Sequence, residues 1–349
     1  MTNAMLCTGL FGDLFRDAEI AREYGAEALL GHMIAFERAW TGALAANGIV
    51  TPAEAEGALA ALAGFDAAAF RPQSDRDGMA VPSLIAQLRA GLATGPARAI
   101  HSGATSQDVI DTALVLAGLS VLALLEARLA RLLALLDGVK ADFGMAPLMA
   151  RTRMQAALPA TVALRVDAWA RLLQAQMSRL PALREELGKV QIGGAIGQRE
   201  APGDEAVARH VAEALGLRLT PVWHGERSAM VSLGHWLGLA AGALGKIGQD
   251  VALMAQQGLD EIALTGGGGS SAMPHKQNPV LAETMVALAR HVAGQQGILM
   301  QAMIHEQERS GAAWALEWLT LPAMAEATGA ALRHAEALIA GIERIGTPG

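Results

Sequence analysis

The side chains best suited to chemistry gather in one polar segment, residues 265–279, which reads Thr-Gly-Gly-Gly-Gly-Ser-Ser-Ala-Met-Pro-His-Lys-Gln-Asn-Pro. Its four glycines favour a mobile backbone, and its two prolines stiffen the second half. Among its side chains are two serine hydroxyls, an imidazole, an ammonium and an asparagine amide: Ser270, Ser271, His275, Lys276 and Asn278. A solvated interhelix loop would also be polar, but loops of this length are uncommon and are usually functional or disordered. Because Gly-Lys-[Ser/Thr] is absent, the segment is a poor match to a phosphate-binding P-loop. We expect it to be functional.

A second polar run, residues 101–108, precedes a long apolar stretch and reads His-Ser-Gly-Ala-Thr-Ser-Gln-Asp. Thr105 or Ser106 could cap the amino end of a helix there. Free backbone amides at such an end can face an anion. Capping alone would also explain these residues, and the two interpretations are compatible.

Arginines supply further anion-binding candidates. Residues 151–155 read Arg-Thr-Arg-Met-Gln, and no carboxylate lies between residues 143 and 166. A solvated basic face explains this spacing equally well. Two later runs, 224–227 (His-Gly-Glu-Arg) and 305–309 (His-Glu-Gln-Glu-Arg), could add Arg227 and Arg309. Histidines do not recur at i and i+4, and Cys7 is the single cysteine, so the sequence gives no support to a metal site or a disulfide framework.

The segments that must position these clusters read as long helices. Hydrophobic residues make up 52% of the chain and aromatic residues only 4%, and the apolar set is mostly Ala and Leu, which are strong helix formers. From residue 106 to 142 apolar residues recur at helical spacing without a proline, which predicts a helix roughly 50 Å long. Other helices are expected over residues 21–47, 161–180, 224–264, 279 to about 310, and about 321 to 345. The capping pattern at residues 51–54 predicts the start of one more helix. The prediction is an all-α, elongated bundle.

Composition also limits the partners. Several of these helices are apolar on nearly all sides, so we favour association between copies of the chain over a core within one chain.

The net charge of −7 argues against a general nucleic-acid binder. The apolar stretch 112–136 is interrupted by Glu126, Arg128 and Arg131, which argues against a membrane span. No signal peptide is evident, so a cytoplasmic protein is expected.

Residues 269–279 resemble the signature GSSxMPxKxNP of the fumarase/aspartase superfamily, and residues 103–112 match its Thr-Ser motif. The similarity runs from about residue 10 to about residue 340. Together with Trp223-His224, Glu308-Arg309, Trp314, Glu317-Trp318 and Leu321-Pro322, these motifs are most similar to the muconate-lactonising branch of the superfamily. That branch closes 3-carboxymuconate to a γ-lactone in protocatechuate degradation, the β-ketoadipate pathway.

The resemblance implies a homotetramer whose active sites are each built from three subunits, with no metal or other cofactor. It implies a small helical domain over 1–101, the long-helix bundle over 102–330 and a short remnant of a C-terminal domain over 331–349. Ser270 would be the base for the Cα proton, while Lys276 and Asn278 would bind carboxylate and support the intermediate. The expected substrate-binding residues are Thr105, Ser106, Gln107, Arg151, Arg153, Gln155, Arg227, Ser271, Met273 and Arg309.

Two departures from the superfamily pattern stand out. The chain is short, and we expect it to lack most of the C-terminal domain of longer relatives. Arg153 also stands where many superfamily lyases have a histidine that assists the leaving group. An amine leaves poorly without a proton. In cycloisomerisation the corresponding group is a carboxylate, whose conjugate acid has a pKa of about 4, so it needs no proton. An arginine could instead orient it by paired hydrogen bonds.

Three alternatives stay open. A fumarate-producing lyase of the adenylosuccinate or argininosuccinate type would be expected to show histidine at position 153. A 3-sulfomuconate cycloisomerase would take a trianion of similar shape. A non-catalytic relative of the lens-crystallin kind is disfavoured by the intact Ser270, Lys276 and Asn278.

Overall fold

The computed structural model describes residues 10–265, 268–269 and 276–348, and it confirms the all-α fold class. The helices are α1 (Gly12–Phe15), α2 (Ala18–Glu23), α3 (Ala26–Ala46), α4 (Pro52–Ala63), α5 (Ser74–Asp77), α6 (Val81–Arg89), α7 (Thr94–Ala99), α8 (Ser106–Phe143), α9 (Val162–Met177), α10 (Leu180–Leu187), α11 (Glu205–Leu215), α12 (Ser228–Met254), α13 (Val280–Gln301) and α14 (Ala312–Ala340). The short strands are β1 (Pro147–Thr152), β2 (Gln155–Thr161), β3 (Ile262–Leu264), β4 (Gly268–Gly269), β5 (Gln277–Asn278) and β6 (Ile342–Ile345).

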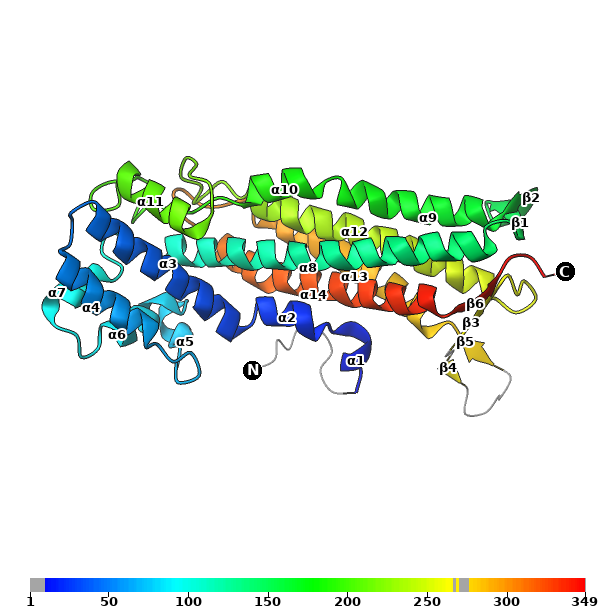
Figure 1. Cartoon of the computed structure of the whole chain (residues 1–349), viewed down its shortest axis with the longest axis horizontal. Coiled ribbons are helices and arrows are strands. Elements are labelled where there is room, and N and C mark those ends of the chain that lie inside the picture. The colour runs from blue at the N-terminus through cyan, green and yellow to red at the C-terminus, as the bar shows by residue number, and fades with distance from the viewer. Residues whose placement is uncertain (1–9, 266–267, 270–275, 349) are drawn as a thin grey trace.

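The molecule is elongated because the long helices α8, α12, α13 and α14, with α9, run alongside one another (Figure 1). Helix α8 has 38 residues and is therefore about 57 Å long. The shorter helices α3 to α7 and α11 gather at the amino end of α8, whereas all six strands lie towards its carboxyl end (Figure 1). This arrangement separates the polar clusters of the sequence into two groups.

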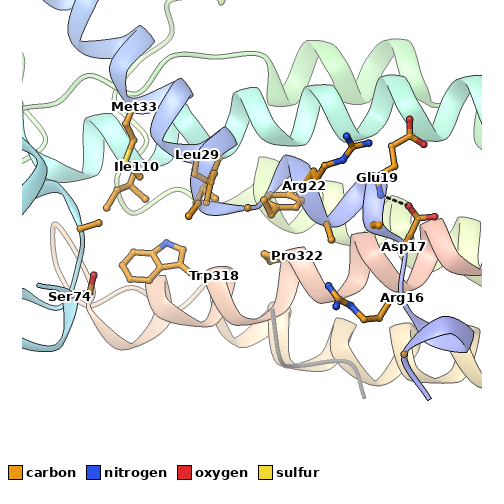
Figure 2. A pocket seen from close by; sticks show the side chains of 18 of the residues that line it. Arg16, Asp17, Glu19, Arg22, Leu29, Met33, Ser74, Ile110, Trp318 and Pro322 are labelled. Atoms are coloured by element: carbon orange, nitrogen blue, oxygen red, sulfur yellow. Dashed lines mark hydrogen bonds between the residues drawn. The ribbon is translucent and has the colours of Figure 1, made fainter. Parts of the chain in front are cut away.

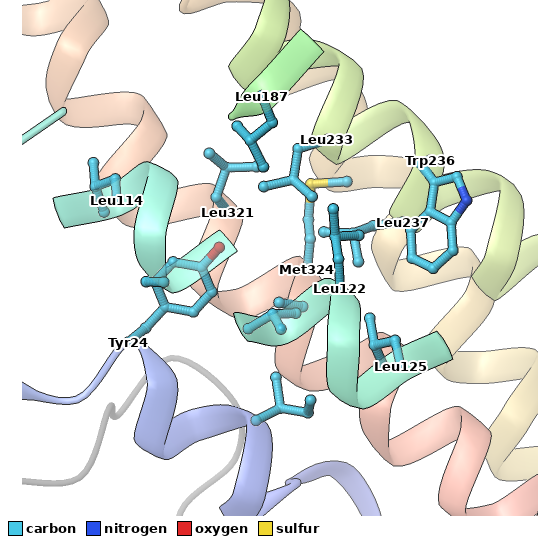
Figure 3. Packing of buried hydrophobic residues seen from close by; sticks show 14 of the residues in the cluster. Tyr24, Leu114, Leu122, Leu125, Leu187, Leu233, Trp236, Leu237, Leu321 and Met324 are labelled. Carbon is cyan, nitrogen blue, oxygen red and sulfur yellow. The ribbon is translucent and has the colours of Figure 1, made fainter. Parts of the chain in front are cut away.

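Buried leucines and small residues hold the bundle together. Leu122 and Leu125 of α8 meet Leu233 and Leu237 of α12 around Met324 of α14 (Figure 3). Truncating one such leucine to alanine typically costs about 2–5 kcal/mol of stability. Glycines let α12 approach α13: a Cβ at position 245 would lie 2.5 Å from the Cβ of Ala289.

Hydrogen-bonded caps fix where the helices begin. Thr51 and Glu54 form the expected capping box at α4, with the Thr51 amide donating to Glu54 over 2.8 Å. Thr105 is the N-cap of α8, and Ser106 is its first residue. The Thr105 amide donates to Asp108 Oδ2 over 3.0 Å.

Some predicted boundaries were wrong. The last helix begins at Ala312 rather than near residue 321, because Pro322 is tolerated inside α14. Residues 342–345 leave the helix and form β6, which pairs antiparallel with β3. The predicted domain division at residues 330 and 331 falls within α14 and stays a prediction. The hairpin of β1 and β2 was not predicted.

Helix α8 contains an 18-residue window that is apolar enough, by length and composition, to cross a membrane. However, 72% of the window is buried inside the protein, which is typical of a core helix.

Candidate active site

The predicted site residues lie in two clusters at opposite ends of α8. The amino-end cluster contains Thr105, Ser106, Gln107, Arg227 and Arg309. The carboxyl-end cluster contains Arg151, Arg153, Gln155, Lys276 and Asn278, all on or beside the short strands. Ser270, Ser271 and Met273 lie outside the described residues. Because α8 is about 57 Å long, a small tricarboxylate bound at one end does not reach the other end of the same chain.

The amino-end cluster is built around the first turn of α8. Arg309 donates to the Thr105 hydroxyl over 3.0 Å and to the carbonyl of Ala195 over 2.9 Å. The buried Asp108 carboxylate accepts from the backbone amides of Gly193, at 2.8 Å, and Gly194, at 3.1 Å. It also lies 3.1 Å from Nε2 of His224. An exposed guanidinium is thereby held beside the amino end of a long helix, which is a favourable place for an anion.

Arg227 is not on the surface of this cluster. Its side chain is fully buried, and its guanidinium donates to Asp111 at 2.7 and 2.9 Å and to Glu317 at 2.7 and 2.6 Å. Binding a substrate carboxylate would leave these two buried carboxylates without their partner, at high cost. Gln107 is also buried, where it donates to Asp111 and to the carbonyl of His224. These contacts support structural roles for both residues, in place of the predicted substrate binding.

The two buried carboxylates differ in how many donors they receive. Asp111 also accepts from Trp314, at 2.8 Å, and from Gln191, at 3.2 Å. Burial alone would raise its pKa, but the Arg227 charge and these donors outweigh burial and lower it. Within the described part of the chain Glu317 accepts from Arg227 alone, so burial dominates and raises its pKa to about 7. The network ties α8, α14 and the start of α12 together behind the amino-end cluster.

At the carboxyl end, Arg153 lies on the turn of the β1–β2 hairpin. Thr152 pairs with Gln155, so the turn consists of Arg153 and Met154 alone. Both have positive φ, 49° and 68°, a conformation that two-residue hairpin turns require but that normally favours Gly, Asn or Asp. Arg153 and Gln155 are exposed.

The other members of the carboxyl-end cluster differ in exposure. Arg151 is half-buried and bonds Glu261 over 2.6 Å. Lys276 is exposed just before β5, and Asn278 is half-buried in β5, opposite Gly268 of β4. Arg153, Gln155 and Lys276 therefore present polar groups to the solvent at this end of the chain.

Two residues of the amino end were missed as site candidates. His101 Nδ1 lies 2.6 Å from Oε1 of the fully buried Glu37, and His101 has a φ of 59°. Side-chain donors from Trp40, Thr41 and Arg89 hold the carbonyls of residues 99, 100 and 102 around it. His101 opens the polar run 101–108, and Glu37 interrupts an apolar helical segment, which was the available signal.

Residues with a strained, left-handed backbone lie in the same polar runs. Of the five described non-glycine residues with positive φ, four lie in the polar runs of the sequence, namely His101, Arg153, Met154 and Gln307. Such conformations cost of order 1–3 kcal/mol each and tend to cluster at functional sites.

A large cavity lies elsewhere. It has a volume of about 1430 Å³ and runs between α2, α3, α8 and α14, where Leu29, Met33, Ile110 and Trp318 line it (Figure 2). None of the predicted site residues in the described part of the chain lines it. Two of the four arginines that line it, Arg16 and Arg128, are already paired with Glu326 and Asp17. This cavity therefore does not mark the place of the predicted chemistry.

Comparisons with known proteins agree with these motifs. The sequence model of a lyase family matches residues 21–294. The chain is 37% identical to 3-carboxy-cis,cis-muconate cycloisomerase of Pseudomonas aeruginosa, covering 96% of this chain and 75% of that protein. It is 31% identical to the protein of the same name from Acinetobacter baylyi, covering 96% and 77%. The crystal structure of 3-carboxy-cis,cis-muconate lactonizing enzyme from Pseudomonas putida superposes with a TM-score of 0.88 at 34% identity, covering 96% of this chain and 77% of that one.

Proposed function

The chain belongs to the lyase family, and from this premise we propose that it is a cycloisomerase that converts 3-carboxy-cis,cis-muconate to a carboxymuconolactone. The observation that carries the proposal is its similarity, over nearly the whole chain, to several enzymes of that name. The reaction is an isomerisation, so it needs no second substrate. Its place would be protocatechuate degradation, the β-ketoadipate pathway.

The chemistry fits the polar groups that the chain offers. A substrate carboxylate oxygen adds to a carbon of the conjugated diene, so a C–O bond forms and the π electrons move to the remote carboxylate. That group becomes an aci-carboxylate, which preorganised donors such as Lys276 and Asn278 would stabilise. Ser270 then delivers a proton to the adjacent carbon and regains one from solvent, so the trianion takes up one proton and no other atom is gained or lost. We expect Ser271 and Met273, which belong to the same segment as Ser270, to contact the substrate.

Arg153 is the residue that separates this chemistry from that of related lyases. It is an exposed guanidinium on a strained two-residue turn, where a histidine would serve amine elimination. A guanidinium can grip the nucleophilic carboxylate with two parallel hydrogen bonds. Gln155, at the far side of the turn, is proposed to contact the same substrate.

We further propose that each active site combines ends from different copies of the chain in a homotetramer. The separation of the two clusters by the length of α8 supports this, because Thr105 and Arg309 cannot meet Lys276 and Arg153 within one chain. Large apolar side chains are exposed on the bundle helices, as at the interface of an oligomer: Leu164, Leu172, Ile298, Met300 and Leu319. We also propose the division into residues 1–101, 102–330 and 331–349. We propose a cytoplasmic location and no nucleic-acid partner.

Purified protein offered 3-carboxy-cis,cis-muconate tests the function. We expect loss of the ultraviolet absorbance of the diene, with a lactone identified by NMR as the product. Adenylosuccinate and argininosuccinate, supplied in parallel, should not release fumarate. Fumarate release without lactonisation would favour the lyase alternative. Faster turnover of 3-sulfomuconate would change the substrate but not the reaction class. No turnover of any of them would favour a non-catalytic relative.

A further inference from the structure

Glu261 is a buried carboxylate that links the two segments of the carboxyl-end cluster. Its side chain is 2% exposed and accepts a 2.6 Å hydrogen bond from Nη1 of Arg151 in β1. It directly precedes β3, the strand that leads towards Lys276 and Asn278. The proposed mechanism gives Glu261 no part in the chemistry. A buried carboxylate is costly unless it is paired, and Arg151 is the partner that offsets this cost.

The partner of Glu261 lies close to the turn of the hairpin. Arg151 is two residues before Arg153, and its Nη1 also donates to the carbonyl of Met149 over 3.3 Å. The pairing of β1 with β2 shifts register between Ala150 and Arg151, as at a β-bulge. Bulges of this kind re-aim the side chains that follow them.

Backbone hydrogen bonds hold Glu261 and the base of the hairpin on one support, residues 342–347. Gly346 donates to the carbonyl of Glu261 over 2.8 Å, and Thr347 donates to the carbonyl of Pro147 over 2.7 Å. Met149 in turn donates to the Thr347 hydroxyl over 3.0 Å. The base of the hairpin is therefore fixed by backbone contacts, whereas its outer part is held to this support by the Arg151–Glu261 pair.

We propose that Glu261 is a positioning residue for Arg153. Through Arg151 it sets the angle of the hairpin, so that the strained turn presents the Arg153 guanidinium to the substrate carboxylate. A pair of apolar residues could supply stability equally well, but it would not fix direction as a charged hydrogen bond does. This inference rests on the proposed lactonisation and on the role of Arg153 in it.

The first test is Glu261→Gln, which keeps the shape of the side chain and removes its charge. Misplacement of a binding group by about 1 Å can cost about a hundredfold in rate. We expect kcat/KM for 3-carboxymuconate to fall roughly ten- to a hundredfold, with part of the fall in kcat.

The matched control is Glu326→Gln. Glu326 is also 2% exposed and bonds one arginine, Arg16, over 2.9 Å, but it lies on α14. This control should lose stability in thermal unfolding without losing turnover. Equal kinetic losses in both variants would overturn the inference, because they would reflect stability alone.

The second test measures coupling. If Glu261 acts through Arg153, then adding Glu261→Gln to Arg153→Lys should cost much less than it costs in the wild type. Full additivity of the two losses would overturn the inference. Should Glu261→Gln fail to fold, Arg151→Lys, which changes a half-buried residue, replaces it in the same cycle with the same expectation.

Wild-type turnover separates this inference from the function itself. If the wild type does not lactonise 3-carboxymuconate, the proposed function fails. If it does and Glu261→Gln matches it, only the positioning role fails.

Discussion

The guanidinium of Arg309 donates a 3.0 Å hydrogen bond from Nη1 to the hydroxyl of Thr105, which is 204 positions away in the sequence. The contact joins the segment before α14 to the N-cap of α8. It places a permanent positive charge beside the amino end of a long helix, and both attract carboxylates.

Replacing Arg309 should therefore weaken substrate binding. Loss of one charge-assisted hydrogen bond costs about 1.5–3 kcal/mol, so Arg309→Met should lower kcat/KM roughly ten- to a hundredfold. Arg209→Met is the control, because Arg209 is an exposed arginine on α11 that bonds only Glu205 of the same helix among the described residues. Steady-state kinetics in which both variants match the wild type would remove Arg309 from the site.

Arg153→His should not improve lactonisation, although it restores the residue of many related lyases. Histidine is largely neutral near pH 7 and cannot grip a carboxylate with two parallel hydrogen bonds. We expect kcat/KM to fall about ten- to a hundredfold, with Arg153→Lys between this variant and the wild type. An unchanged kcat/KM in Arg153→His would falsify the assignment, and a gain would indicate a general-acid role at this position.

Ser270→Ala should abolish turnover while the fold and the oligomer stay intact. Proton transfer by a positioned group is worth about 10²–10⁴-fold. Circular dichroism and light scattering serve as controls for fold and assembly. If the variant keeps more than about a tenth of wild-type turnover, another group transfers the proton.

The buried Glu317 makes stability depend on pH. Burial raises its pKa to about 7 in the folded chain, above the ordinary value of 4.5, so the folded state binds this proton more tightly than the unfolded state. The stability that it contributes is present below about pH 4.5 and is lost as the pH rises to about 7, by up to roughly 3 kcal/mol. Asp111 titrates below its ordinary 3.8 and Arg227 stays charged, so neither changes in this window.

Glu317→Gln fixes the neutral form and isolates this effect. The Tm of the wild type minus that of the variant should decrease from pH 5 to pH 7 and stay constant above that. A difference that does not vary with pH would contradict the raised pKa of Glu317.

The long helices could be predicted from sequence because proline-free runs with helical spacing are local signals. Helix α8 was expected over 106–142 and spans Ser106–Phe143. The β1–β2 hairpin was missed because its turn is Arg153-Met154, which carries none of the usual Asn-Gly or Asp-Gly signal.

Long-range pairing could not be predicted at all. The partners of Arg227 lie 116 and 90 positions away, so nothing local showed that it was buried and fully engaged. The division of the site residues between two ends of α8 was hidden for the same reason. Spacing along a chain does not tell which clusters meet in space or in which copy of the chain they meet.

Subunit mixing tests whether one lactonising site takes its two ends from different copies of the chain. Lys276→Met should inactivate the carboxyl end, and the double variant Thr105→Val/Arg309→Met the amino end. Light scattering should show that the wild type and both variants are tetramers. The two variants are unfolded together and reassembled, and mixed oligomers are isolated by two different affinity tags. If each site draws its ends at random from different copies, about a quarter of the sites regain both intact ends, and lactonisation recovers accordingly. Mixed tetramers as inactive as either parent would contradict the account.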